Sequence, residues 1–292
     1  MKRFGLSPSG PAEPKEHSAS ERTGHSGPEP KEHPASERTG RFGLIGHPVA
    51  GSFSPKLFEA AYGGRYPYDL LEGAEFGASW QRFLDEYDGI NITAPFKQDA
   101  FRAVDALSDD ARLCGAVNLA VKTPAGIVGY NTDVAGVVLA VREALAALDT
   151  QPVIPGLTGN LLKEALVVGC GGAGRAAAVA ALRLGCRVTL ANRTPSRAAA
   201  LADDLGCDWI PADDLSSLSP DLVIYTVPGP MDGFPVFPEA IVLEANYRTP
   251  CLKGCGRTYI SGLRWLLFQA VAGYEIFTGE TPDADAMFRI FC

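Results

Sequence analysis

Apolar residues are distributed unevenly along the chain, and this unevenness separates residues 1–40 from the rest. These residues contain only six members of the apolar set, together with six prolines. So few apolar side chains cannot bury enough surface to offset the entropy lost when a backbone is ordered. The pattern therefore predicts a disordered tail over residues 1–40 and a folded body over residues 41–292.

The tail also contains an internal repeat. Segment 13–24 recurs almost unchanged as segment 29–40, and residues 3–6 recur as residues 41–44, where the first strand is expected. A solenoid needs at least about three repeats that share an apolar face, and these repeats have none. We interpret the tail as a duplicated insertion ahead of the first strand; a targeting or docking arm is the alternative.

From residue 41 onward, short apolar runs alternate with stretches of helical periodicity. Apolar runs bounded by Gly, Pro or Asn are typical of strands, whereas a Ser-Pro step before an apolar-periodic stretch is typical of a helix start. Strands that alternate with helices predict an α/β domain. In the first half we expect strands at 41–46, 66–71, 89–92, 117–122 and 127–130, and helices from Ser54 and at 75–86, 97–107 and 133–148.

The second half begins with a turn-rich segment, 149–163, that predicts a loop. An apolar strand at 165–168 then leads into a G-x-G-x-x-G turn at 169–174 and an alanine-rich helix, the order that dinucleotide binding requires. Glycines let the backbone approach a pyrophosphate, and the helix N-terminus offers free N–H groups. A tight turn without a ligand is the alternative. Further strands are expected at 187–191, 221–227 and 240–244, and helices at 262–278 and 282–291.

The residues after the strand at 187–191 distinguish the two nicotinamide dinucleotides. NAD sites usually place a carboxylate here to accept a hydrogen bond from the ribose 2′-hydroxyl group. This chain has Arg193 instead, with Arg197 one helical turn further on, and guanidinium groups match a 2′-phosphate. We therefore predict NADP rather than NAD as the cofactor. The predicted cofactor contacts are Gly169, Gly171, Gly172, Ala173, Gly174, Asn192, Arg193, Thr194 and Arg197.

The net charge and the rare residue types argue against several classes of protein. The net charge of −8 argues against nucleic acid as the main partner, although a small anionic ligand needs only a local basic pocket. Three of the four histidines lie in the tail, which argues against Ser-His-Asp hydrolysis, HExxH metalloprotease chemistry and Cys/His zinc fingers, and we expect no metal. The seven scattered cysteines are typical of reduced thiols in a cytoplasmic protein, and no apolar run is long enough for a membrane span.

Three short motifs in the first half place polar side chains where expected strands end. Residues 51–55 put the hydroxyl groups of Ser52 and Ser54 at a helix start, which suits a carboxylate ligand. Lys97 follows the third expected strand, and Asp133 opens a helix after the fifth. Each has an ordinary alternative, namely a helix cap for Ser54 or Asp133 and a solvated surface lysine for Lys97.

Several motifs occur in one order along the body: Ser52-x-Ser54-Pro55, Asn91-x-Thr93-x-Pro95-x-Lys97, Gly115-Ala116-Val117-Asn118, Asn131-Thr132-Asp133-x-x-Gly136, the glycine turn, Asn192-Arg193-Thr194-x-x-Arg197-Ala198 and Gln269-Ala270. Together they resemble the shikimate dehydrogenase family, with no counterpart for the tail. That family has an N-terminal α/β substrate domain, a Rossmann NADP-binding domain and C-terminal helices that return to the first domain. The resemblance implies a substrate-binding and catalytic domain over 41–135 and 262–292, and a Rossmann domain over 136–261.

The resemblance also implies a reaction and a set of site residues. The family reduces 3-dehydroshikimate reversibly to shikimate with NADPH, in chorismate and aromatic amino acid biosynthesis. A ketone that accepts a hydride becomes an alkoxide, which needs a proton donor or positive charge nearby, and a lysine held by a carboxylate supplies one. By resemblance, Lys97 and Asp133 form the catalytic pair, Ser52, Ser54 and Tyr247 hold the substrate carboxylate, and Thr93, Asn118 and Gln269 bind the ring hydroxyl groups.

The chain departs from the family pattern at several positions. Residues 225–230 replace the usual Asn-Ala-Thr near the nicotinamide, and Glu244 stands where Asp is usual. Trp265 replaces the usual Met, where it either narrows the cleft or fills the core. Two alternatives stay open: a quinate/shikimate dehydrogenase with relaxed cofactor use, and a non-catalytic NADP-binding paralogue, against which the retained catalytic pair argues. A monomer and a homodimer are both compatible with the sequence.

Overall fold

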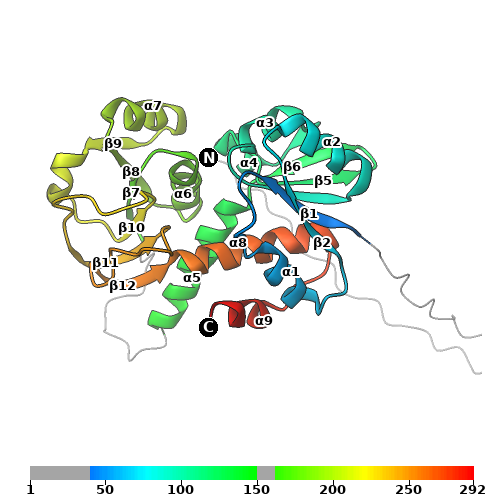
Figure 1. The fold of residues 1–292 in the computed structure, drawn as a ribbon. Helices are drawn as coiled ribbons and strands as arrows, with labels where there is room; N and C mark the ends of the chain where they lie inside the picture. The colour runs from blue at the N-terminus through cyan, green and yellow to red at the C-terminus, as the bar shows by residue number, and fades with distance from the viewer. Residues whose placement is uncertain (1–39, 150–161) are drawn as a thin grey trace, which may run out of the picture. The chain divides into compact units, whose positions relative to one another are not determined.

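The computed structural model describes residues 40–149 and 162–292, and within them the chain forms two six-stranded sheets (Figure 1). The predicted tail lies outside the described residues up to residue 39, and residues 150–161 of the predicted loop lie outside them as well. Strands and helices alternate along both described ranges, which confirms the predicted α/β class.

The first sheet is mixed. Its strands are β1 Phe42–Gly46, β2 Tyr68–Glu72, β3 Gly89–Ile92, β4 Ala106–Leu107, β5 Leu119–Thr123 and β6 Gly126–Tyr130. They lie in the order β2-β1-β3-β5-β6-β4. Strand β1 runs parallel to both β2 and β3, whereas β5 is antiparallel to β3 and to β6, so that β5 and β6 form a hairpin.

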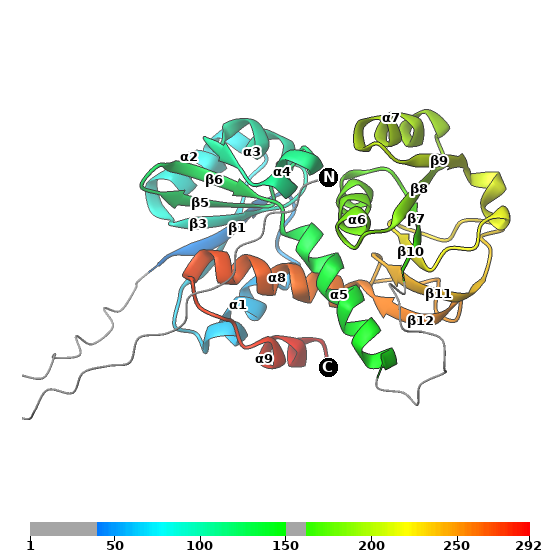
Figure 2. The same ribbon diagram turned by 180° about the vertical axis from the view of Figure 1, so that it is seen from behind.

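Helices cover both faces of this sheet (Figures 1 and 2). They are α1 Ser54–Tyr62, α2 Phe76–Glu86, α3 Lys97–Ala103, α4 Asp109–Cys114, α8 Gly262–Thr278 and α9 Ala284–Phe288. One face packs against α1, α8 and α9 through buried aromatic rings such as Phe58 and Tyr274, and the other packs against α2, α3 and α4 around Phe83. Because Thr278 of α8 donates to the Tyr62 hydroxyl group of α1 at 2.8 Å, the C-terminal helices return to the first sheet as predicted.

The second sheet is entirely parallel. Its strands are β7 Glu164–Val168, β8 Arg187–Asn192, β9 Asp208–Pro211, β10 Leu222–Tyr225, β11 Phe237–Glu244 and β12 Gly256–Ser261, in the order β12-β11-β10-β7-β8-β9. One core cluster joins this sheet to the helices α5 Thr132–Asp149, α6 Gly172–Arg183 and α7 Pro195–Leu205, and a second joins it to the 3₁₀ turn η1 Ala212–Ser217 and neighbouring loops. Burial on both faces explains the continuous apolar runs of the central strands.

Several predictions about elements are wrong in detail. The helix expected at 97–107 ends at Ala103, because the chain becomes extended at Val104 and pairs as β4 with β6. The short helix α4 and the outer strands β9 and β12 were not predicted at all. The helix expected at 282–291 is a five-residue helix, α9, followed by the 3₁₀ turn η2 Arg289–Phe291.

Helices α5 and α8 link the two sheets (Figures 1 and 2, green and orange). Helix α5 follows β6 of the first sheet, and α8 follows β12 of the second, so each helix carries the chain between them. Gly136 lets the two helices approach closely, since a Cβ atom there would lie 2.8 Å from Gln269 Cβ and from Trp265 Cδ1. The crossing of these helices places Asp133 and Gln269 side by side at the cleft described next.

Candidate active site in the cleft between the sheets

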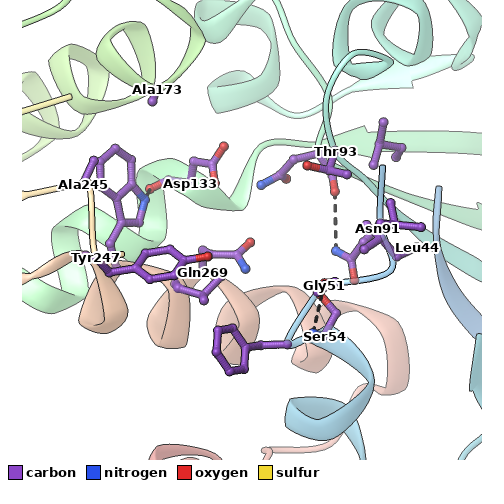
Figure 3. Close-up of a pocket in the computed structure, with 18 of the residues that line it drawn as sticks. Leu44, Gly51, Ser54, Asn91, Thr93, Asp133, Ala173, Ala245, Tyr247 and Gln269 are labelled. Atoms are coloured by element: carbon purple, nitrogen blue, oxygen red, sulfur yellow. Dashed lines mark hydrogen bonds between the residues drawn. The ribbon is translucent and has the colours of Figure 1, made fainter. Parts of the chain in front are cut away.

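A cleft of about 490 Å³ is lined by residues that follow strands of both sheets (Figure 3). Strands β1, β3 and β6 end at the same edge of the first sheet, and the loops after them enter the cleft, as is usual for ligand sites at carboxyl ends of strands. The predicted catalytic and substrate-binding residues all line this cleft: Ser52, Ser54, Thr93, Lys97, Asn118, Asp133, Tyr247 and Gln269. The structure therefore brings together eight residues that are spread over most of the folded body in the sequence.

Lys97 and Asp133 form an ion pair in this cleft. Lys97 Nζ donates to Asp133 Oδ2 at 2.7 Å, and the two side chains are 33% and 18% exposed. The backbone of Asp133 is also held in place, because Asp133 N donates to Asn131 Oδ1 at 3.2 Å. The alternative interpretation of Lys97 as a solvated surface lysine is wrong, since its ammonium group is paired and faces the cleft.

A hydrogen-bond network orients the amide side chains beside this pair. Thr132 N donates to Asn118 Oδ1 at 2.8 Å, and Asn118 Nδ2 donates to Thr132 Oγ1 at 3.1 Å. The same hydroxyl group lies 3.2 Å from Gln269 Oε1. A residue just before β5 and residues of α5 and α8 are thereby held in one fixed arrangement, as preorganised polar contacts require.

Ser52 and Ser54 form a pair of hydroxyl groups at the start of α1. Ser54 N donates to Ser52 Oγ at 3.1 Å, and the two Oγ atoms lie 3.0 Å apart. The predicted role of Ser54 as a helix N-cap is wrong, because the N-cap is Phe53 and no side chain caps this helix. Both hydroxyl groups instead face the cleft, where they can donate to an anionic oxygen.

A buried carboxylate fixes the loop that carries Tyr247. Glu244 is 0% exposed and accepts hydrogen bonds from Cys251 N at 2.7 Å, Leu252 N at 3.1 Å and the Tyr259 hydroxyl group at 3.0 Å. These bonds tie the end of β11 to the residues after the loop and to β12. Both carboxylate oxygens of Glu244, which stands where Asp is usual, therefore accept hydrogen bonds. The loop that carries Tyr247 to the cleft is held at its base by these bonds.

Trp265 serves the core and the cleft at once. Its side chain is 7% exposed and packs in the core cluster beside α5, and its ring also lines the cleft. The indole Nε1 donates to the backbone oxygen of Asp133 at 2.9 Å. The interpretation that Trp265 fills the core is therefore confirmed, and Trp265 also lines the cleft, where its indole supports the residue that holds Lys97.

The glycine turn of the second sheet has the geometry of a dinucleotide-binding turn. Helix α6 begins at Gly172, its N-cap is Gly171, and no side chain caps it, so its first N–H groups stay available for a phosphate. Gly169 has φ of 99°, in the left-handed region that glycine adopts without strain. Ala173 also lines the cleft, which places one end of this turn at the site of the Lys97–Asp133 pair.

The other predicted cofactor contacts lie beside this turn at the end of β8. Asn192 fastens the two segments together, since Cys170 N donates to its side-chain oxygen at 3.2 Å and its amide group donates to Thr194 O at 3.0 Å. Arg193 and Arg197 are exposed and make no ion pair within the part of the chain that the structure describes. The unpaired guanidinium groups of Arg193 and Arg197 therefore lie close to a turn that is suited to binding phosphate.

Cys170 lies within the glycine turn itself. Burial raises the pKa of the Cys170 thiol to about 11, so the thiol is protonated at neutral pH. It consequently adds no negative charge to a turn that is suited to phosphate. All seven cysteines are free thiols.

Metal ligation and membrane insertion find no support in the described residues. Over 40–149 and 162–292, no three His, Cys, Asp or Glu side chains gather in a way that could hold a metal ion. No helix in the same ranges is sufficiently long and apolar to cross a membrane.

Fold and site together define a class of protein, the two-domain dinucleotide-dependent dehydrogenases, in which a dinucleotide turn on one sheet adjoins a polar cleft on the other. Comparisons with known proteins narrow this class. Residues 44–120 match the family model described as the shikimate dehydrogenase substrate binding domain. A shikimate dehydrogenase (NADP(+)) from Acidiphilium cryptum is 36% identical over 270 residues, which are 85% of this chain and 94% of that protein. The chain belongs to the shikimate dehydrogenase family.

Two solved structures show the same fold. Shikimate 5-dehydrogenase from Thermus thermophilus, in complex with NADP(H) and shikimate, superposes with a TM-score of 0.73 at 30% identity, covering 85% of this chain and 97% of that one. Quinate dehydrogenase from Corynebacterium glutamicum, in complex with NAD, superposes with a TM-score of 0.74 at 27% identity, covering 87% and 98%. The predicted two-domain arrangement with a Rossmann-type domain is confirmed.

Proposed function

We propose that this chain is an NADP-dependent shikimate dehydrogenase, which reversibly reduces 3-dehydroshikimate to shikimate. The observation that carries the proposal is the cleft in which the eight predicted substrate and catalytic residues meet around the Lys97–Asp133 pair. The family relationship supports the same activity, because a relative with this name aligns over 94% of its length.

Lys97 acts at the reacting oxygen in this proposal. NADPH, when bound, supplies the hydride that reduces the ketone. The Lys97 ammonium group then stabilises the developing alkoxide and donates its proton, while Asp133, at 2.7 Å, orients the ammonium group in the cleft. In the reverse direction the neutral amine accepts the proton of the alcohol.

The remaining cleft residues bind the substrate. Ser54 and Tyr247 both line the cleft (Figure 3), and Ser52 Oγ lies 3.0 Å from Ser54 Oγ. We assign the substrate carboxylate to these three residues. We assign the ring hydroxyl groups to Thr93, Asn118 and Gln269, which lie towards the catalytic pair. Amide and hydroxyl side chains suit this task because each offers both a donor and an acceptor.

We further propose that the second sheet binds the cofactor. Its pyrophosphate would lie on the N–H groups around Gly171–Gly174, and Asn192, Arg193, Thr194 and Arg197 would surround the adenosine ribose. The domain limits follow: residues 41–135 with 262–292 for the substrate, and residues 136–261 for NADP. The seven free thiols favour a cytoplasmic location, and we propose a monomer or a homodimer.

One assay tests the activity. Purified protein is incubated with NADP or NAD and with shikimate or quinate, and the absorbance of the reduced nicotinamide is followed. We expect turnover with NADP and shikimate. Faster turnover with quinate or with NAD would favour the alternative of a quinate/shikimate dehydrogenase, whereas silence in all four combinations would favour a binding protein that has lost catalysis.

A double substitution tests the cofactor assignment. Replacing Arg193 and Arg197 by serine should raise KM for NADP about 100-fold, because two charge-assisted hydrogen bonds to the 2′-phosphate are lost. KM for NAD should stay unchanged, since NAD has no phosphate at that position. Arg142→Ser is the matched control, because Arg142 is an exposed arginine on α5, away from β8. An equal rise in KM for both cofactors would contradict the assignment.

A further inference from the structure

Arg248 is a cleft residue that neither the sequence motifs nor the proposed catalytic scheme uses. It lines the cleft and follows Tyr247 in the loop after β11. Across the cleft lies Gly51, next to Ser52, and a Cβ atom on Gly51 would be 4.0 Å from Arg248 Nη2. The guanidinium group therefore reaches from the second sheet to the loop of the first sheet that holds the two serine hydroxyl groups.

The backbone beneath Arg248 is held firmly. The Asn246 amide group donates to Pro228 O at 2.7 Å and to Thr249 O at 3.0 Å, and Thr249 N donates back to Asn246 Oδ1 at 3.2 Å. These bonds close a turn directly around Arg248, and the buried carboxylate of Glu244 fixes the strand end just before it. The loop thus presents the guanidinium group from a fixed base.

Among the charged side chains that line the cleft, Arg248 has no opposite charge paired with it in the described residues. Three charged side chains line the cleft, namely Lys97, Asp133 and Arg248. The first two neutralise each other at 2.7 Å, whereas Arg248 is exposed and makes no ion pair with any residue that the structure describes. A site with one free guanidinium group beside two hydroxyl groups is complementary to a single carboxylate.

We propose that Arg248 binds the substrate carboxylate together with Ser52 and Ser54, as a specificity-determining cation supplied from the opposite sheet. This inference rests on the proposed function, because it takes the substrate to be a cyclic hydroxy acid. The carboxylate then joins the two halves of the cleft: hydroxyl groups hold it on one side and a guanidinium group holds it on the other.

Steady-state kinetics of Arg248→Gln with shikimate and with shikimate methyl ester test the inference. In Arg248→Gln, KM for shikimate should rise about tenfold or more, because a hydrogen-bonded charge pair is removed. The value of kcat should change by less than about twofold, since the carboxylate lies away from the reacting oxygen, and KM for NADP should not change. The ester has no charge, so wild type and variant should bind it equally. Arg248→Lys, which keeps the charge, should recover part of the loss.

Arg257→Gln is the matched control, because Arg257 is exposed on β12 and does not line the cleft. An unchanged KM for shikimate in Arg248→Gln, or an equal penalty for acid and ester, would overturn the inference. So would a rise in KM for NADP alone, which would place Arg248 against the cofactor. If the wild type reduces neither NADP nor NAD with shikimate, the proposed function fails. Calorimetric titration of shikimate into wild type and Arg248→Gln then tests the inference separately, and equal affinities for shikimate reject it.

Discussion

Alanine in place of Lys97 should lower kcat about 10²–10⁴-fold, the range typical for the loss of one acid–base group. The expected change in KM for shikimate is much smaller, because Lys97 acts on charge that develops in the transition state and little of that charge exists in the bound ketone or alcohol. The pair geometry supports this expectation: the ammonium group faces the cleft and lies 2.7 Å from the carboxylate that orients it.

Two measurements, one control variant and one double variant make the Lys97 experiment decisive. Steady-state kinetics separate kcat from KM, and urea denaturation shows whether the variant is folded. Lys56→Ala is the matched control, because Lys56 is an exposed lysine on α1 that does not line the cleft. Adding Asp133→Asn to Lys97→Ala should cost little more than Lys97→Ala alone, since the two residues act as a unit. Turnover of Lys97→Ala within about threefold of wild type would exclude Lys97 from the proton transfer.

Eight residues that line the cleft were predicted because several motifs in one order together resemble the shikimate dehydrogenase family, whereas each motif taken singly has an ordinary alternative. Polar residues directly after apolar runs, such as Lys97 after β3 and Asp133 after β6, have no core to fill and lie at one edge of the sheet. Parallel alignment of those strands then brings distant segments together. What the motifs could not provide is the network within the site, such as the hydrogen bond from Trp265 to the backbone of Asp133.

The role proposed for Arg248 could not be predicted from the sequence. Nothing in its neighbourhood marks it, since an exposed arginine in a loop is ordinary, and its importance depends on the loop's approach to Gly51 across the cleft. Only the packing of the two sheets about α5 and α8 creates that approach. The same dependence on tertiary contacts hid β4, whose two residues become a strand only by pairing with β6.

The missed helix α4 is a different case, because a local signal for it exists. Ser108 caps it by accepting from Ala111 N at 3.2 Å, and Asp109 and Asp110 occupy its first turn. A serine followed by acidic residues is a typical helix start. The outer strands β9 and β12 carry no such signal, since each has a partner on one side only and alternates weakly between buried and exposed positions.

Alanine in place of Gly174 should destabilise the protein by about 2–3 kcal/mol, as overpacking a closed interior does, and should strongly weaken NADP binding. A Cβ atom there would lie 1.7 Å from the backbone oxygen of Gly169, so α6 or the turn itself must move. That movement displaces the N–H groups proposed to bind the pyrophosphate. Urea denaturation without cofactor measures the stability, and fluorescence titration with NADPH measures the affinity.

The sign of the stability change separates this steric account from a simple helix-propensity effect. Gly174 lies in the first turn of α6, where alanine normally stabilises a helix by up to about 1 kcal/mol relative to glycine. Gly172→Ala is the matched control in the same turn, because a Cβ atom there meets no atom within 4 Å, and its stability should equal or exceed that of the wild type. An equally stable Gly174→Ala variant would show that the turn and α6 do not pack as closely as the structure requires.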